Sequence, residues 1–317
     1  MIKNMMSAVL LVMCSCAIMA QENAVPVLKN KVAKVCAGLR FPEGPAWDGK
    51  GHLIVSNCQA DYITRVSLDG KIDQKWMTAS AGDQPFTWKG TNGMTYGRDG
   101  SFYVCDNKRK AIVEVSPKLQ CKAYALSCDD HPLNGPNDLA FDAHGNLYFT
   151  DPEGSDLQHP IGQICRIDRK THKTIKVAGG LAYCNGLAFS GDGKYLFVCE
   201  SKPNRILRYT VKADGSLGER EIFCDLAPVG SGEPDGLAVD TKGNLWIAHY
   251  GQHHLVVVNL HGKITGLLPL PIERDGGPTN IEFAGKDLRT VYITDPGTGS
   301  LWMFHADTPG LRLFYAP

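Results

Sequence analysis

One pattern of polar and apolar positions recurs along most of the chain. In each copy a polar residue precedes a short apolar strand, a glycine-containing turn and a second apolar strand that ends at a polar residue. The fullest copy runs from Asn137 to Asp151. The six copies begin at residues 43, 92, 137, 185, 235 and 279, so successive starts differ by 49, 45, 48, 50 and 44 residues. A period of this length is typical of the four-stranded blade of a β-propeller.

The turns within the copies indicate antiparallel hairpins. Asp and Gly recur in the first turn, as in 142–145 and 240–243, and in the second turn, as in 69–70 and 214–215. Glycine adopts positive φ without strain and an aspartate side chain bonds back to the backbone, so both residues are typical of tight strand connections. We therefore expect strands of about five residues throughout and no long helix.

The segment before the first copy predicts how the ring closes. Lys34-Val35-Cys36 and the six residues after it have nearly the same pattern as 176–184, where an outer strand leads into the fourth copy. No blade precedes this first segment, so it should complete the last blade and leave no open sheet edge. The sequence thus predicts an all-β fold, a six-bladed β-propeller closed by an N-terminal strand, as a single domain over residues 21–317.

The start of the chain has a different character. Lys3 precedes the apolar run 8–14, and Ala20 ends a small-residue stretch before the polar residues 21–23. This layout predicts a secretory signal peptide over residues 1–20 and export to the periplasm or the medium. The alternatives are a buried N-terminal strand and, for an exported protein, lipid attachment at Cys16.

Charge and composition exclude several partners. Lys plus Arg and Asp plus Glu both number 33, so no net charge favours binding to nucleic acid or to an anionic membrane. Beyond the signal peptide, no apolar run approaches the ~20 residues that a membrane-spanning helix needs. The hydrophobic content of 43% is sufficient for a core. The sequence carries no signal for an oligomeric state.

The cysteines show no recognisable framework. Nine of the 11 lie beyond residue 20, which is an odd number, and they include no CxxC pair and no Cys–His metal spacing. Cys105 and Cys199 occupy the same strand position in two copies, and we expect small buried residues there rather than a disulfide framework. In an exported protein at least one thiol would be free.

The repeat register predicts two concentric rings of polar residues at one face of the propeller. The first strand of each copy leads away from its polar first residue and the second strand returns, so both polar ends lie on the same face. The inner ring comprises Glu43, Asn92, Asn137, Asn185 and Asp235, with Thr279 or Asn280 in the sixth place. The outer ring comprises Asn57, Asp106, Asp151, Glu200, His249 and Asp295.

The inner ring has the composition of a site for a hard divalent cation. Its two carboxylates would raise each other's pKa in a narrow channel unless a positive ion lay between them. Oxygen ligands of mixed charge suit Ca²⁺, Mg²⁺ or Mn²⁺. The alternative is that the Asn and Asp residues only cap strand starts and turns. Turn chemistry does not ask for Glu43, however, and the repetition in five copies favours a metal.

Other catalytic patterns are absent from the sequence. It contains no GxSxG, HExxH or GxGxxG motif. Of the histidines at 249, 253 and 254, only His249 is directed at the pocket by the register, where it could position a substrate or shuttle a proton. The other two are expected in a surface loop.

Four motifs resemble the SMP-30/gluconolactonase/LRE-like family. They are FPEGPAW at 41–47, PNDLAFD at 136–142, CNGL at 184–187 and PDGL at 234–237, and the resemblance covers essentially the whole mature chain. It implies a six-bladed propeller with one divalent metal ion in the central channel, Ca²⁺ or else Mg²⁺, Mn²⁺ or Zn²⁺. The metal ligands of the family map onto Glu43, Asn185 and Asp235. Asn137 would complete the shell directly or through water and substrate.

The reaction that the resemblance implies is hydrolysis of a lactone. The metal would polarise the lactone carbonyl or a bound water and stabilise the oxyanion of the tetrahedral intermediate. We expect Asp235 to act as general base and Glu43 mainly as a charge-bearing ligand. The residues expected to contact the substrate are Asn92, Asn137, Asp151 and His249.

One position departs from the sugar-lactone members of the family. Those closest to the animal proteins carry an Arg two residues before the third-copy Asn, where it contacts substrate hydroxyls, and here that residue is Gly135. An aldonolactone, another hydroxylated lactone and an unrelated ester therefore stay open as substrates. Two other functions also stay open: a non-enzymatic propeller that binds carbohydrate or protein, and an aryl-ester or phosphotriester hydrolase on the same fold.

Overall fold

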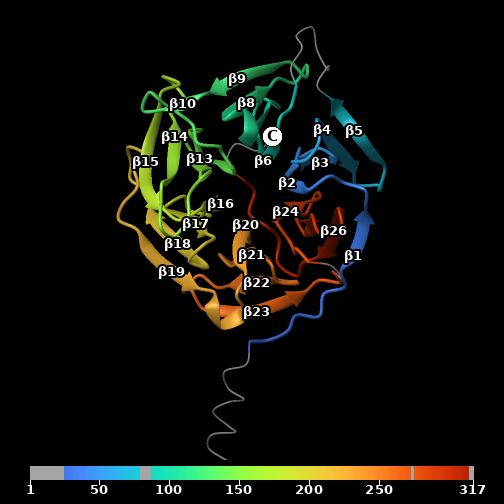
Figure 1. The fold of residues 1–317 in the computed structure, drawn as a ribbon. Coiled ribbons are helices and arrows are strands. Elements are labelled where there is room, and N and C mark those ends of the chain that lie inside the picture. The colour runs from blue at the N-terminus through green and yellow to red at the C-terminus, as the bar shows by residue number, and fades with distance from the viewer. Residues whose placement is uncertain (1–24, 79–86, 273–274, 314–317) are drawn as a thin grey trace, which may run out of the picture.

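The structure is a computed structural model that describes residues 25–78, 87–272 and 275–313. The predicted signal peptide over residues 1–20, including Cys16, lies outside the described residues. The chain forms six four-stranded antiparallel sheets arranged as blades around a central axis (Figure 1). This arrangement confirms the predicted all-β, six-bladed propeller.

In the first five blades the strands follow chain order from the axis outward. The first blade consists of β2 (Pro42–Trp47), β3 (His52–Asn57), β4 (Tyr62–Ser67) and β5 (Ile72–Thr78). The second consists of β6 (Thr91–Tyr96), β7 (Phe102–Asp106), β8 (Ala111–Val115) and β9 (Cys121–Ala125). The third consists of β12 (Leu139–Phe141), β13 (Leu147–Asp151), β14 (Gly162–Ile167) and β15 (Thr174–Leu181). The next two consist of β16 (Cys184–Phe189), β17 (Tyr195–Glu200), β18 (Arg205–Thr210), β19 (Glu221–Asp225); and β20 (Glu233–Val239), β21 (Leu245–Tyr250), β22 (His254–Val258), β23 (Ile264–Pro269).

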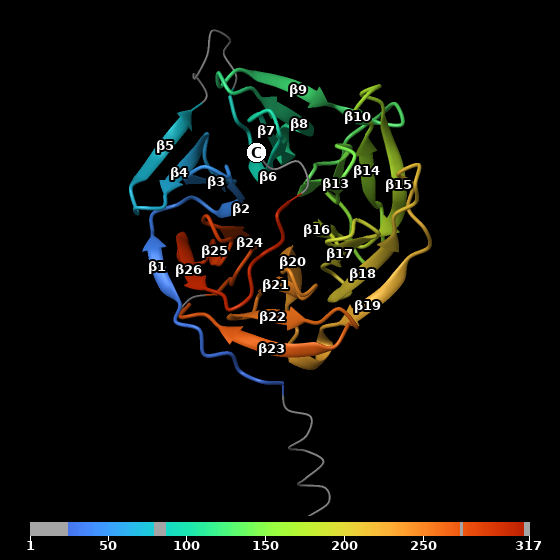
Figure 2. The ribbon, with the colours of Figure 1, turned by 180° about the vertical axis from the view of Figure 1, so that it is seen from behind.

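The sixth blade joins the two ends of the chain. Its strands are β24 (Asn280–Ala284), β25 (Thr290–Asp295), β26 (Ser300–His305) and, at the outer edge, β1 (Ala33–Cys36). Ala33 pairs with Met303 in an antiparallel register. Both views show β1 beside β26, on the far side of the ring from β13 (Figures 1 and 2). The N-terminal strand therefore takes the place that the sequence pattern gives it.

Little structure lies outside the blades. A two-stranded ribbon of β10 (Ser127–Cys128) and β11 (His131–Pro132) precedes the third blade, and η1 (Asn107–Arg109) and η2 (Ala227–Val229) are single 3₁₀ turns. Within the described ranges, no helix has the length and apolar character needed to cross a membrane.

The hydrophobic core lies between adjacent blades, because each twisted sheet presents its apolar side chains to its neighbours. Tyr148 of the third blade packs edge-on against Phe189 of the fourth, with ring centroids 5.2 Å apart. Trp246 of the fifth blade contacts Phe283 of the sixth in the same way at 6.2 Å. Burial of each such side chain contributes about 1.5–3 kcal/mol, so the contacts between blades hold the ring together.

The hairpin turns form for the reasons that the sequence pattern indicates. In the third blade Asp142 Oδ1 accepts hydrogen bonds from the backbone N–H groups of His144 and Asn146, at 2.8 and 2.9 Å. Gly145 in the same turn has a φ of 84°, which a side chain would strain. The turn thus places β12 and β13 side by side and brings their polar ends to one face.

One disulfide joins Cys128 of β10 to Cys165 of β14. The sequence analysis did not anticipate this pair, because the two residues are 37 positions apart and carry no motif. Cys105 and Cys199 are buried and unpaired, which agrees with the expectation for these two positions. The bond ties the segment that enters the third blade to that blade.

Loss of this disulfide should lower stability. The chain-entropy relation for a 37-residue loop predicts that Cys128→Ser reduces the free energy of unfolding by about 4 kcal/mol. Chemical denaturation under non-reducing conditions measures this difference. Cys121→Ser, which removes an unpaired thiol from β9, is the matched control. Equal stability of the two variants would contradict a stabilising role for the bond.

Candidate metal and substrate site

The inner ring lies at one end of the propeller axis, where the first strand of each blade begins. Glu43, Asn137 and Asn185 are almost completely buried, with 5–7% of their surface exposed. Asn92 and Asp235 are half-buried at the second and fifth places. Asn137 precedes its strand by two residues, and its own backbone N–H donates to Thr150 of β13. The predicted ring is therefore the floor of a site that opens on one face.

Glu43, which is buried, and Asp235, which is half-buried, are two carboxylates without a protein counter-ion. Burial raises the pKa of Glu43 to about 8, although the Gly44 N–H donates to it at 3.2 Å. Burial, and then the charge of Glu43, raise the pKa of Asp235 well above its ordinary value. In the part of the chain that the structure describes, neither carboxylate forms an ion pair with Lys, Arg or His.

Carboxamide side chains surround the two carboxylates. Asn185 Nδ2 donates to Ser201 Oγ at 3.3 Å, so its carbonyl oxygen is available to a ligand. The same carboxamide lies close enough to Asp235 to lower the pKa of that carboxyl in part. Thr279 and Asn280, the two candidates for the sixth place of the ring, lie close enough to the Glu43 carboxylate to lower its pKa in part. The Thr279 hydroxyl itself donates to Pro42 O at 3.1 Å.

This donor set fits a divalent cation. Two buried carboxylates raise each other's pKa, and a positive ion between them would remove the cost of holding both charged. Among the described residues no three His, Cys, Asp or Glu side chains are grouped as a metal site, so the carboxamides would supply the further oxygens. The residues that fit are the predicted four, namely Glu43, Asn137, Asn185 and Asp235. Metal binding itself stays a prediction.

A second layer below the ring was not anticipated from the sequence. In four of the six copies the residue directly after the first position of the copy is glycine. In the third copy this residue is Asp138, and in the sixth copy it is Asn280. A Cβ on Gly93 would lie 2.3 Å from Asp138 Oδ1, and one on Gly236 would lie 2.2 Å from Asn280 Oδ1. The glycines thus make room at the axis for two larger polar side chains, and their repetition is the sequence signal for this layer.

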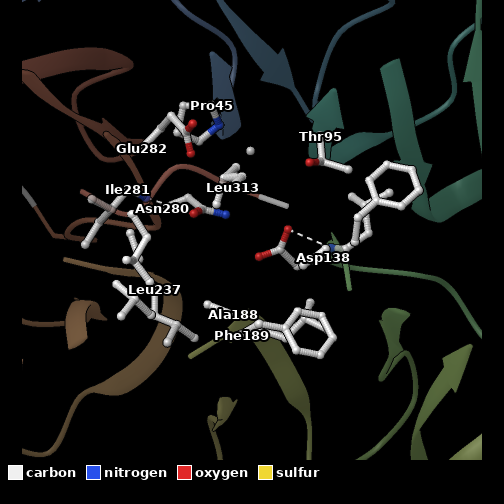
Figure 3. A pocket seen from close by; sticks show the side chains of 18 of the residues that line it. Pro45, Thr95, Asp138, Ala188, Phe189, Leu237, Asn280, Ile281, Glu282 and Leu313 are labelled. Carbon is white, nitrogen blue, oxygen red and sulfur yellow. Dashed lines mark hydrogen bonds between the residues drawn. The ribbon is translucent and has the colours of Figure 1, made fainter. Parts of the chain in front are cut away.

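Asp138 and Asn280 face each other across a cavity of about 110 Å³ in the central channel. Figure 3 shows the carboxylate of Asp138 pointing into this cavity towards the carboxamide of Asn280. Burial raises the pKa of Asp138 to about 7, and the facing Asn280 carboxamide lowers it in part. Glu282 stands farther down the channel, at a repeat position where four of the other copies carry Ala, and burial raises its pKa to about 8.

The C-terminal segment covers the other end of this channel. The backbone N–H of Leu311 donates to Val239 O at 2.9 Å, and Gly310 pairs with Asp240 at the hairpin turn of the fifth blade. Leu311, Arg312 and Leu313 line the cavity from that side. In Figure 1 the red end of the chain crosses the middle of the ring. Access to the ring of polar residues is therefore from the opposite face.

The outer ring anchors the segments that lead into the blades. Asp151, for example, is fully buried and accepts hydrogen bonds from the backbone N–H groups of Asn134 and Gly135, at 2.9 and 2.7 Å. Three other outer-ring residues likewise accept a hydrogen bond from a backbone N–H that lies 16–18 residues earlier in the chain. The pairs are Arg40 N–H to Asn57, Gly90 N–H to Asp106 and Ala182 N–H to Glu200. Asp295 differs, because it accepts from Gly297 N and Trp302 Nε1 on its own blade.

His249 holds a comparable structural position. Its ring is fully buried, with Nε2 2.9 Å from Asn204 Oδ1 and Nδ1 3.4 Å from His254 Nε2. Burial lowers the pKa of His249 to about 4, so the ring is neutral near pH 7. The side chains of Asp151 and His249 are thus engaged within the protein, and their predicted contact with substrate stays a prediction, as does that of Asn92.

Comparison with known proteins gives the same family as the motifs. Residues 41–296 match the family model described as SMP-30/Gluconolactonase/LRE-like region. A gluconolactonase of Zymomonas mobilis is 26% identical over 295 residues, which cover 86% of this chain and 81% of the relative. A 6-deoxy-6-sulfogluconolactonase of Pseudomonas putida is 35% identical over 134 residues, which span 42% of this chain and less than half, 44%, of the relative.

Solved structures show the same fold. Regucalcin of Agrobacterium tumefaciens, described as a calcium-binding protein, superposes with a TM-score of 0.72 at 18% identity. The match covers 92% of this chain and 100% of that chain. At this identity the likeness shows the propeller fold alone.

Proposed function

This chain belongs to the SMP-30/gluconolactonase/LRE-like family, and we propose that it is a metal-dependent lactonase. The observation that carries the proposal is the pair of carboxylates at the floor of the site, Glu43 and Asp235, beside carboxamide oxygens and without a protein counter-ion. Its relatives named gluconolactonase and sulfogluconolactonase support the reaction class. The family and the calcium-binding regucalcin support a divalent ion, with Ca²⁺ first among the candidates.

The proposed reaction adds water across the ring ester. The water oxygen bonds to the carbonyl carbon, the bond from that carbon to the ring oxygen breaks, and the ring oxygen takes up a proton, which gives a hydroxy acid. When bound, a divalent ion supplies Lewis-acid polarisation and lowers the pKa of a coordinated water. Glu43, Asn137, Asn185 and Asp235 would hold it.

Asp235 is the residue that we propose as general base. It is a half-buried carboxylate at the floor of the open face, beside the carboxamide of Asn185. A carboxylate in such a place can take the proton of an attacking water and return it to the leaving oxygen. Glu43 is more deeply buried and accepts a hydrogen bond from the Gly44 N–H, which suits a charge-bearing ligand that does not move.

The test of the proposal is lactone hydrolysis by the mature protein after metal removal and after resupply of Ca²⁺, Mg²⁺, Mn²⁺ or Zn²⁺. We expect activity on sugar or aliphatic lactones to disappear on chelation and to return with at least one ion. The same ion should raise the melting temperature, because it binds the folded ring and not the unfolded chain.

Three outcomes would contradict the proposal. If the folded, metal-loaded protein hydrolysed no lactone and no ester, a non-enzymatic binding propeller would replace it. If it turned over only aryl esters or phosphotriesters, the other hydrolase activity would replace it. Full lactonase activity after removal of the metal by a chelator would contradict the proposed metal dependence.

A further inference from the structure

The hydroxyl of Ser201 stands between the fourth and fifth blades. Ser201 directly follows the outer-ring residue Glu200, at the end of β17, and only 1% of its surface is exposed. Its N–H donates to Tyr183 O at 2.9 Å, and its carbonyl accepts from the Asn204 N–H at 3.0 Å. Strand β17 lies beside β20 in both views (Figures 1 and 2). The Ser201 side chain is therefore held in place at the border of two blades.

The two hydrogen bonds of this hydroxyl have a fixed direction. Ser201 Oγ lies 2.7 Å from Pro234 O, and a carbonyl oxygen can only accept, so the hydroxyl proton points to Pro234. Asn185 Nδ2 lies 3.3 Å from the same Oγ and is the donor of the second bond. If the two ends of the carboxamide were exchanged, Oδ1 of Asn185 would face an oxygen with no proton to give. The Ser201 hydroxyl therefore decides that the carbonyl end of Asn185 is the one left for a ligand.

The bond to Pro234 O holds the backbone directly before Asp235. Pairing between β20 and β21 is regular up to Pro234 and resumes three residues later. Asp235 and Gly236 lie in the irregular stretch between these points, where the sheet ladder does not fix the backbone. Ser201 binds the first end of this stretch from the neighbouring blade. One hydroxyl thus fixes the side chain of Asn185 in the fourth blade and the backbone that carries Asp235 in the fifth.

The first copy contains a related bond with a different side chain. Cys58 directly follows the outer-ring residue of its blade, and its Sγ donates to Thr91 O at 2.7 Å. Thr91 directly precedes the next inner-ring residue, as Pro234 does. The inner-ring residue of the first copy is Glu43, whose carboxylate has no N–H to donate. The thiol therefore serves the bond between blades alone, whereas the hydroxyl of Ser201 also accepts from a carboxamide.

We propose that Ser201 is a positioning residue for the metal site. Its hydroxyl presents the Asn185 carbonyl oxygen and the Asp235 carboxylate to one ion, and it acts through these two residues rather than on the ion. Groups that orient metal ligands typically change metal affinity 10–100-fold when they are removed. The identity of the bound group as a divalent ion rests on the proposed function, whereas the orientation of Asn185 by Ser201 does not.

The first experiment measures metal binding by calorimetry, with whichever of Ca²⁺, Mg²⁺, Mn²⁺ and Zn²⁺ binds wild type most tightly, and stability by urea denaturation. Ser201→Ala should raise Kd for this ion about tenfold. Ser201→Cys keeps a donor for Pro234 O, as in Cys58, but sulfur is a weak acceptor for Asn185 Nδ2. We therefore expect Ser201→Cys to raise Kd about tenfold as well, while its urea midpoint stays closer to that of wild type than the midpoint of Ser201→Ala does.

Ser101→Ala is the matched control. It removes a buried hydroxyl, bonded to Asp99 at 3.0 Å, from the turn at the opposite end of the second blade. This variant should lower the urea midpoint and leave Kd within about twofold of wild type. A role of Ser201 in packing alone predicts the same behaviour for Ser201→Ala and predicts that Ser201→Cys restores Kd.

A double-mutant cycle in the metal-free protein separates this inference from the proposed function. Asn185→Ala and Ser201→Ala each remove one end of the same hydrogen bond. The equilibrium constant of unfolding of the double variant should therefore be about fivefold smaller than the product of the single effects. If wild type bound no divalent ion, the proposed function would fail and this cycle would decide the inference.

Three results would overturn the inference: independent effects in the cycle, a Kd of Ser201→Ala within twofold of wild type, or restoration of Kd by Ser201→Cys. If Ser201→Ala did not fold, the Kd of Ser201→Cys would decide.

Discussion

Asp235→Asn is expected to lower kcat for lactone hydrolysis about a thousandfold, the middle of the range for loss of a general base. The substitution keeps the shape of the side chain beside Asn185 but removes the carboxylate that takes the proton. The substitution also removes the repulsion between this carboxylate and Glu43, whose charge helps to raise the pKa of Asp235. The folded structure should therefore survive the change.

The measurement is kcat at several concentrations of the activating ion, with bound metal determined in parallel. Asp225→Asn removes one exposed carboxylate from β19 and should leave kcat within about twofold of wild type. If excess metal restored kcat of the Asp235→Asn variant to within tenfold of the wild-type value, Asp235 would act only as a metal ligand. The proton would then be taken by another group.

Gly186→Ala is expected to lower the free energy of unfolding by about 3 kcal/mol and to abolish metal binding. A Cβ at this position would lie 2.5 Å from Asp235 O and 2.6 Å from Gly236 Cα. Both are backbone atoms of β20, so no rotation of a side chain can relieve the overlap. The methyl group would instead push β16 from β20 and separate Asn185 from Asp235, which belong to these two strands.

Denaturation and metal titration of the variant give the two quantities. Gly179→Ala is the matched control, because its nearest neighbour would be the flexible Lys176 side chain, at 3.4 Å, on the outer strand β15. We expect this control to change stability by less than about 1 kcal/mol. An unchanged metal affinity in Gly186→Ala would show that the ring does not depend on the close approach of these two strands.

The period and the inner ring could be predicted because they depend on local rules. Alternation of polar and apolar residues defines each strand, Asp and Gly define each turn, and together they fix which end of a strand Glu43 or Asp235 occupies. The closing strand could be predicted by comparing two segments of the same chain. Each of these inferences needs only neighbours in sequence or a repeat of them.

The features that the sequence did not reveal depend on contacts between blades. Asn280 of the sixth blade lies close enough to Glu43 of the first blade and to Asp138, which precedes the third blade, to lower the pKa of both carboxyls. No local sequence pattern indicates that these three residues meet. The backbone N–H groups of Asn134 and Gly135 donate hydrogen bonds to Asp151. This outer-ring residue therefore has a structural role that the repeat register alone does not indicate. The Cys128–Cys165 bond and the C-terminal cover of the channel likewise join segments that no motif relates.

The closure of the ring has a consequence for the order of events during synthesis. β1 is the first blade strand to leave the ribosome, and its partner β26 is made last, with Ala33 and Met303 separated by 270 residues (303 minus 33). At the usual pace of translation this interval lasts about 15–50 s. During that time the strand and the growing array both expose unpaired edges, which other nascent chains can bind. The last blade to be translated therefore ends the period in which this protein is most prone to aggregate.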